Sequence, residues 1–235
     1  MDKGQQTLES MSMAPAYNKW ILKKFSKYLK GEILEIGSGI GNFTKLLIKY
    51  GDVWASDISK EYLSKIKQEI PEVKGVGIVD IEQGKYFFNN RQNTSVNKKF
   101  DVIVCLNVIE HIKNDQNAFT NLQRLLKPKG VLILIVPSGM NLYGKIDQAI
   151  GHYRRYNKSD LQKQLHDAGF KILKSRLLNF IGGLGWFFSG RVLKQTTVKK
   201  TNVKIFNVIS PVFLLLEKFW EPPIATSVFI IARKG

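Results

Sequence analysis

Short apolar runs alternate with helix-like segments through most of this chain, and this alternation limits the possible folds more than any other feature. Strand-like runs occupy residues 32–36, 53–57, 76–80, 100–106 and 131–136. The last two runs are apolar except for Asp101, as expected for strands buried on both faces of a sheet. Strands separated regularly by helices predict a doubly wound α/β fold with a mostly parallel sheet and right-handed crossovers.

The helical segments and the chain organisation follow from the same patterning. Helices are expected at residues 42–50, 60–69, 118–127 and 159–168. We expect Pro128 to end the third helix and Ser159 to cap the fourth. The chain then divides into an amphipathic basic helix region at 1–30, an α/β core at 31–176, an apolar and basic insertion at 177–224, and a returning edge strand at 225–235.

A glycine-rich turn follows the first predicted strand. Residues 35–41 read EIGSGIG, with glycines at every second position after an acidic residue. In such a turn the backbone N–H groups point at a ligand, which can approach closely because no side chains intervene. The dinucleotide-binding pattern is G-x-G-x-x-G, and this turn differs from it in spacing.

This turn resembles the first motif of the class I S-adenosylmethionine-dependent methyltransferases. The likeness continues through residues 100–111 and through the turn at 126–130, so that it covers about residues 30–170. It implies S-adenosylmethionine as cofactor. The residues it implies in cofactor binding are Glu35, Gly37, Gly39 and Gly41 at the methionine end, Asp57 at the ribose, Asp80 at the adenine, and Asn107 in the cofactor pocket.

Three histidines limit the search for a catalytic base. Methyl transfer from a sulfonium mainly needs alignment and exclusion of water, but a hydroxyl acceptor can still need a base. His111 follows the fourth predicted strand, at the strand end where ligands bind in such sheets, and His152 lies in the segment GHYRRY at 151–156. The candidate base is therefore either His111 or His152, whereas His166 is expected at the surface.

The same GHYRRY segment supplies the candidate acceptor contacts. Aromatic rings beside arginines suit a sugar or ring that bears phosphate or carboxylate. The predicted acceptor-binding residues are Tyr153, Arg154, Arg155 and Tyr156.

The formal net charge of +17 indicates an anionic partner, either nucleic acid or a membrane surface. Residues 107–110 read NVIE and not the Asn/Asp-Pro-Pro-aromatic run of amino-directed nucleic-acid methyltransferases, so nucleic acid is the weaker candidate. Residues 168–216 contain no acidic residue but two apolar stretches. They are interpreted either as a lid or as a contact with an anionic membrane, and a membrane contact would suit a lipid-linked acceptor.

Other totals exclude several classes. The single cysteine, Cys105, can form neither an internal disulfide nor a zinc cage, which favours a reducing compartment and a cytoplasmic protein, with peripheral membrane contact left open. Neither apolar stretch offers the roughly twenty clean residues of a spanning helix. No metal site is predicted.

O-methylation of a small or lipid-linked acceptor is the favoured function. The alternatives are an RNA-directed methyltransferase and a non-catalytic cofactor-binding module.

Overall fold

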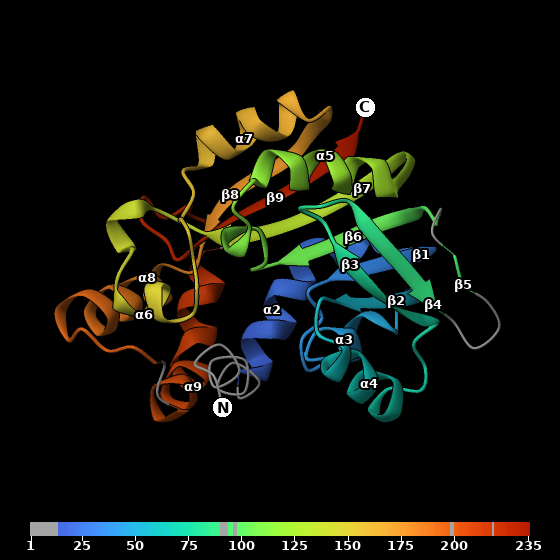
Figure 1. Cartoon of the computed structure of the whole chain (residues 1–235). Helices are drawn as coiled ribbons and strands as arrows, with labels where there is room; N and C mark the ends of the chain where they lie inside the picture. Colours follow the sequence, from blue (N-terminus) through green and yellow to red (C-terminus); the bar gives the residue numbers. More distant parts are fainter. Residues whose placement is uncertain (1–13, 90–93, 96–97, 198–199, 218) are drawn as a thin grey trace.

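A computed structural model describes residues 14–89, 94–95, 98–197, 200–217 and 219–235, and in this part of the chain one sheet organises the molecule (Figure 1). Its nine strands follow the order β5-β4-β3-β2-β1-β6-β7-β9-β8. Strands β3, β2, β1, β6 and β7 are parallel, and the remaining pairings are antiparallel. The strands are β1 (Glu32–Ile36), β2 (Asp52–Asp57), β3 (Gly75–Asp80), β4 (Lys85–Asn89), β5 (Thr94–Ser95), β6 (Phe100–Leu106), β7 (Leu126–Pro137), β8 (Phe170–Leu178) and β9 (Ser227–Lys234).

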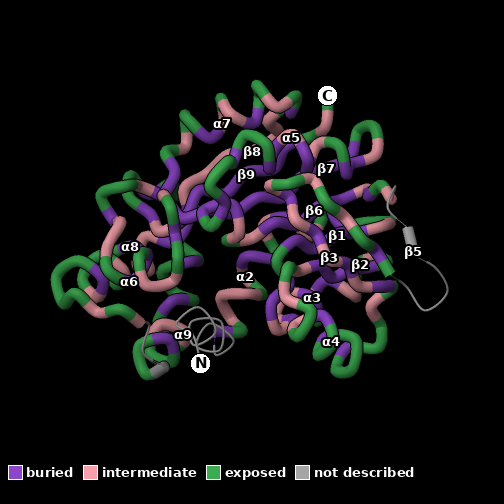
Figure 2. The backbone as a smooth tube through the Cα atoms, in the orientation of Figure 1, coloured by how far each residue is buried: buried purple, intermediate pink, exposed green. Residues whose placement is uncertain are grey.

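Helices cover both faces of the sheet, which confirms the doubly wound architecture (Figure 1). One face carries α2 (Pro15–Phe25), α3 (Thr44–Leu47) and α4 (Lys60–Glu69), and the other carries α5 (Asp115–Leu125) and α7 (Lys158–Asp167). Alternate residues of β6 serve the two faces, because Val102 and Val104 join the core under α2 whereas Ile103 and Cys105 join the core under α5. The buried residues accordingly concentrate along the sheet (Figure 2).

Three predicted helices had wrong boundaries, each for a local reason. Only α3 is regular within 42–50, because the flanking residues form tighter turns in which Leu46 N–H bonds to the Phe43 carbonyl and Tyr50 N–H to that of Leu47. Helix α5 starts earlier, at a cap formed by the Asn114 side chain, and it ends at Leu125, so Pro128 lies within β7.

The start of α7 also differs from the prediction. Asn157, with extended backbone, is its N-cap, whereas Ser159 already lies inside the helix and bonds Asp160.

The last strand is not at the edge of the sheet, as the sequence suggested. It lies between β7 and β8, with Ile231 opposite Ile133 on one side and Lys174 on the other. Every residue from Ser227 to Ala232 is buried, which suits an interior position. The edge is formed by β8, a strand missed in the sequence. Its half-exposed basic residues fit an edge, where charged side chains discourage pairing with other chains.

The insertion forms a helical group beside the start of α2 (Figure 1). It contains α8 (Phe180–Phe187), a π-helical turn at Phe188–Val192, and α9 (Lys200–Leu216), with α6 (Lys145–Ala149) against it. Helix α9 packs on α2, where Trp20 Nε1 donates to the Leu214 carbonyl at 3.1 Å. Among the described residues, no helix has both the length and the apolarity to cross a membrane.

Candidate active site

The glycine turn after β1 requires glycine for conformation and for space. Gly37, Gly39 and Gly41 have φ values of 70°, 51° and 82°, which side-chain-bearing residues rarely adopt. A Cβ atom at Gly37 would lie 2.4 Å from Cγ2 of Val108, and one at Gly41 would lie 2.7 Å from Cδ1 of Ile70. The turn is therefore fixed between the segment after β6 and the end of α4.

Carboxylates stand at the ends of the three neighbouring strands β1, β2 and β3. Asp57 ends β2, and its two oxygens accept backbone N–H bonds from Gly39 and Ser59, both at 2.9 Å. Asp80 ends β3 and accepts the Gln83 N–H at 2.9 Å. Both side chains are half-buried, so the structure brings Asp57 against the glycine turn and leaves Asp80 accessible at the next strand end.

Glu35 lies beneath the turn and is 4% exposed. Burial raises the pKa of its carboxyl to about 7, although the hydrogen bond from Thr44 Oγ1, 2.5 Å from Oε2, acts in the opposite direction. A nearby cation stabilises the ionised form of such a buried carboxyl group and so lowers its pKa. The glycine turn, Glu35 and Asp57 thus fit a cofactor that carries positive charge and a ribose diol.

The segment after β6 joins this turn to a second cluster of polar residues. Asn107 has a φ of 55° and donates its N–H to the Ile135 carbonyl, while Val108 contacts Gly37. The next residues form a 3₁₀ turn, Ile109–His111, and the Glu110 carbonyl accepts the Tyr153 N–H at 2.8 Å. The GHYRRY segment therefore lies against the residues that border the glycine turn.

Asp147 organises the second cluster, and sequence reasoning missed it. Its carboxylate is fully buried and lies 2.8 Å from His152 Nδ1, 2.9 Å from Arg155 Nε and 3.1 Å from Trp186 Nε1. Burial acts to raise the pKa of Asp147, but the hydrogen bond from His152 and the charge of Arg155 hold it below its usual range. Asp147 is therefore ionised at neutral pH and fixes the orientation of the His152 ring.

Glu110 lies on the other side of His152. Its carboxyl is fully buried, neither oxygen has a hydrogen-bond partner, and Oε1 is 3.7 Å from His152 Nε2. Burial raises the pKa of Glu110 to about 8, so that the group is mostly protonated at pH 7. An unpartnered buried carboxyl costs stability, and such costs concentrate at functional sites.

His111 completes this cluster. Its ring meets the His152 ring edge to face, with centroids 4.7 Å apart. Desolvation, and then the neighbouring His152, lower the pKa of His111 to about 4, which keeps it neutral. The ligand atoms of Glu110, His111 and His152 lie within 4.8 Å of one another, a spacing at which a metal ion could be held. The prediction of a metal-free site stays a prediction.

The four predicted acceptor-binding residues have different surroundings. Arg154 and Tyr156 both bond Asp115 Oδ2, at 2.9 and 3.0 Å, and this contact anchors the segment to the start of α5. Arg155 is buried on Asp147, whereas Tyr153 is 57% exposed. Their contact with an acceptor stays a prediction, and Tyr153 is the one with most of its surface available.

Asp147 and Trp186 left only weak signals in the sequence. Asp147 is a single acid within the mostly apolar segment 146–150, and Trp186 belongs to the distant apolar segment interpreted as a lid or a membrane contact. Their proximity to His152 depends on how α6 and α8 pack, which local pattern does not reveal. His166, by contrast, is at the surface as predicted, with its side chain 82% exposed.

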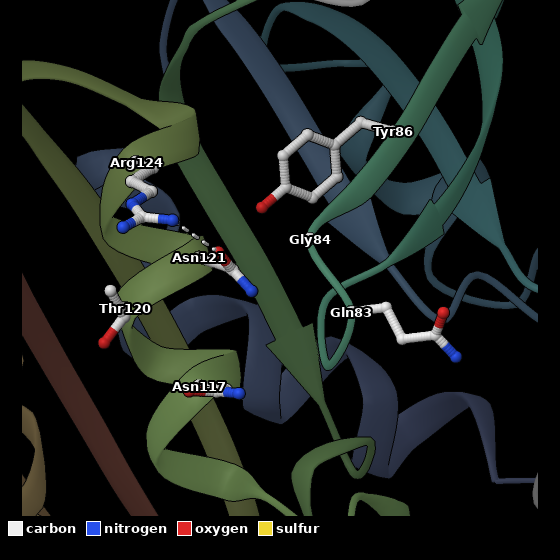
Figure 3. Close-up of a pocket in the computed structure, with 7 residues that line it drawn as sticks. All are labelled: Gln83, Gly84, Tyr86, Asn117, Thr120, Asn121 and Arg124. Carbon is white, nitrogen blue, oxygen red and sulfur yellow. Dashed lines mark hydrogen bonds between the residues drawn. The ribbon is translucent and has the colours of Figure 1, made fainter.

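A separate polar cavity of about 290 Å³ lies between α5 and the turn that joins β3 to β4 (Figure 3). Figure 3 shows Tyr86 on one wall and Arg124 with Asn121 on the other. The lining contains none of the predicted site residues: it is formed by Gln83, Gly84, Tyr86, Asn117, Thr120, Asn121 and Arg124. We assign the candidate site to the strand ends and not to this cavity.

Comparisons with known proteins agree with the fold and the turn. The family described as "Methyltransferase domain" matches residues 13–175. An uncharacterized protein of Methanocaldococcus jannaschii is 27% identical over 161 residues, which cover 68% of this chain and 64% of the relative. A ubiquinone biosynthesis O-methyltransferase of Rickettsia canadensis is 27% identical over 176 residues, or 67% of this chain and 72% of that protein.

Solved structures show the same fold at low identity. An S-adenosylmethionine-dependent methyltransferase of Clostridium acetobutylicum superimposes with a TM-score of 0.59 at 17% identity, over 94% of this chain and 92% of that one. The phosphoethanolamine N-methyltransferase 2 of Haemonchus contortus, solved with S-adenosylmethionine, gives 0.59 at 19% identity, over 93% and 52%. With its doubly wound sheet, its glycine turn and the family match over residues 13–175, this chain belongs to the class I S-adenosylmethionine-dependent methyltransferases.

Proposed function

We propose that this enzyme methylates a hydroxyl group of a small-molecule acceptor, free or lipid-linked, and that His152 is the catalytic base. The observation that carries the proposal is the Asp147–His152 hydrogen bond of 2.8 Å, in a buried cluster beside the segment that borders the glycine turn. The O-methyltransferase of Rickettsia canadensis, named for ubiquinone biosynthesis, supports the choice of a hydroxyl acceptor.

The hydrogen bond within the cluster suits a base. In the proposed step His152 donates its Nδ1–H to the ionised Asp147 carboxylate, and Nε2 is the atom that accepts the proton. In the proposed step the acceptor oxygen bonds to the methyl carbon and the carbon–sulfur bond breaks, with its electron pair going to sulfur. The hydroxyl proton moves to Nε2, and the resulting imidazolium is stabilised by Asp147.

The cofactor supplies an activated methyl group, and the chain's own residues hold it in line. We assign Glu35 and the three glycines to the methionine end, Asp57 to the ribose, Asp80 to the adenine and Asn107 to the pocket wall. Asp57 and Asp80 each stand at a strand end with half-buried oxygens that can accept further hydrogen bonds. For the acceptor we propose contacts with Tyr153 and with Arg154, the members of the GHYRRY segment whose side chains reach solvent.

Substitution of His152 tests the base. With methyl-labelled S-adenosylmethionine and a set of catechol, hydroxyquinone and sugar-phosphate acceptors, His152→Gln is expected to lower kcat by about 10²–10⁴-fold while the KM for the cofactor stays unchanged. His166→Gln is the matched control, because that side chain is exposed. Wild-type turnover in His152→Gln would exclude the proposed role, and absence of turnover with every acceptor would favour a non-catalytic module.

Chelation tests the predicted metal independence. Glu110, His111 and His152 are close enough to hold an ion, but the proposed base needs Nε2 of His152 to be free. We expect turnover after dialysis against a chelator to match that of the untreated enzyme. If chelation abolishes turnover and added Mg²⁺ or Zn²⁺ restores it, the proposed base is wrong. A bound metal ion would then activate the acceptor hydroxyl.

A further inference from the structure

Helix α9 exposes apolar side chains on the side that faces away from the protein. Val203, Ser210 and Leu214 are buried and mark the inward side. Six apolar residues on the opposite side of the helix are 43–75% exposed and define what we call the outer face of α9: Ile205, Val208, Ile209, Val212, Leu215 and Leu216. A surface helix normally directs apolar residues to the core and polar ones outward, so the apolar outer face departs from the usual pattern.

The exposed charges of the insertion that carries the outer face are of one sign. No acidic residue occurs from 168 to 216, while Arg191, Lys194 and Lys204 are exposed within the insertion. Helix α2, which packs on α9, adds the exposed Lys19. The next exposed acid along the chain, Glu221, is paired with Lys158 at 2.8 Å.

We propose that the outer face of α9 docks on an anionic lipid bilayer. A bilayer supplies apolar chains for the exposed side chains and negative headgroups for the lysines and arginine of the same insertion. A second copy of the chain would also cover apolar surface, but it would bring another formal charge of +17 to the contact. A helix of 17 residues is only about 26 Å long, which suits a helix lying on the surface and not one crossing it.

Hydrogen bonds join the helix that carries the outer face to the candidate active site. The Glu217 carboxylate, just beyond α9, accepts the N–H groups of Asn179 and Phe180 at the start of α8, both at 2.8 Å. Trp186 of α8 in turn donates to Asp147 at 3.1 Å. Docking through α9 would therefore hold the proposed base at a fixed place relative to the bilayer. This inference rests on the proposed function for the acceptor, which would be drawn from the lipid phase.

Vesicle sedimentation of the purified full chain tests the docking without any turnover. The chain is expected to sediment with vesicles of phosphatidylcholine and phosphatidylglycerol at low salt, and to stay in solution with phosphatidylcholine alone. The triple variant Val208→Asn/Val212→Asn/Leu215→Asn should lower the bound fraction at least tenfold. Lys204→Gln/Lys19→Gln should weaken binding and reduce its salt sensitivity.

Two controls keep the result interpretable. Phe87→Asn removes an apolar side chain that is 57% exposed on β4, away from α9, and should bind vesicles like the wild type. The three α9 positions are exposed, so the triple variant should unfold at the wild-type temperature and methylate a water-soluble acceptor normally.

Three outcomes would overturn the docking. These are no sedimentation of the wild type, sedimentation of the triple variant at the wild-type level, or a dimer in sedimentation velocity that the triple variant abolishes. Each is independent of the His152 experiment, so failure of the membrane surface and failure of the proposed base are distinguishable.

Discussion

Glu35 is a titratable group placed where the cofactor's charge would change its proton affinity. Its pKa of about 7 is raised chiefly by burial, so about half of the unliganded protein carries a proton there at pH 7. If a cationic cofactor binds the ionised form, binding must displace that proton at lower pH. We expect the affinity for S-adenosylmethionine to fall about tenfold from pH 8 to pH 6 in wild type.

Glu35→Gln separates this titration from other effects of pH. The glutamine can still accept the hydrogen bond from Thr44 Oγ1 but cannot ionise. Calorimetric titration at each pH should therefore give a weaker affinity that no longer changes between pH 6 and pH 8. If the cofactor affinity of Glu35→Gln depended on pH as steeply as that of the wild type, a group other than Glu35 would be responsible.

Gly37 offers a test of the turn's geometry with an internal control. Gly37 and Gly139 have φ values of 70° and 72°, but only the Cβ of an alanine at 37 would meet a neighbour, at 2.4 Å from Val108. Gly139→Ala has open space. We expect Gly37→Ala to lower the free energy of unfolding by about 1–3 kcal/mol more than Gly139→Ala does in urea titrations. It should also abolish cofactor binding, and equal effects of the two variants would contradict this view of the turn.

At the scale of elements, the junction between α8 and α9 depends on one buried carboxylate. Glu217 is 2% exposed and accepts two backbone N–H groups, so Glu217→Ala would leave both unpaired in a dry environment. We expect a loss of about 2–4 kcal/mol in the free energy of unfolding, measured by urea denaturation.

Glu221→Ala is the matched control for this junction. Its carboxylate also accepts a backbone N–H, from Leu177 at 2.8 Å, but the side chain is 35% exposed, so water can replace it. The expected loss is about 1 kcal/mol or less. Similar losses in the two variants would show that burial does not determine the strength of the junction.

Elements with a strong periodicity could be predicted from the sequence, whereas those defined by packing could not. The bounds of β1, α4 and β6 agree with the predicted ranges 32–36, 60–69 and 100–106, because apolar pattern and turn residues coincide there. Strand β8 escaped prediction because its basic, half-exposed residues lack the alternation of a buried strand.

The site shows the same division. The glycine turn and Asp57 are local signals that the structure brings together. Asp147 reaches His152 only because α6 folds back on the GHYRRY segment, and no spacing in the sequence encodes that contact.

At the scale of the whole molecule, the charge of +17 must be explained by partners or by solubility. The proposed docking surface accounts for part of it without nucleic acid. We therefore expect RNA to bind only weakly, with an affinity that falls steeply as salt rises, because such binding would come from phosphate contacts alone. RNA should not accept the labelled methyl group. Ribonuclease-sensitive label from a cell extract would instead favour the RNA-directed alternative.

The place of β9 between β7 and β8 affects how the chain can fold during synthesis. Residues 170–178 leave the ribosome about fifty residues before 227–234, yet they have no partner in the sheet until β9 arrives. Until then β7 is an unpaired edge of the sheet. The apolar side chains of the insertion are also without a completed core to pack against. Completion of the described sheet therefore depends on β9 being translated.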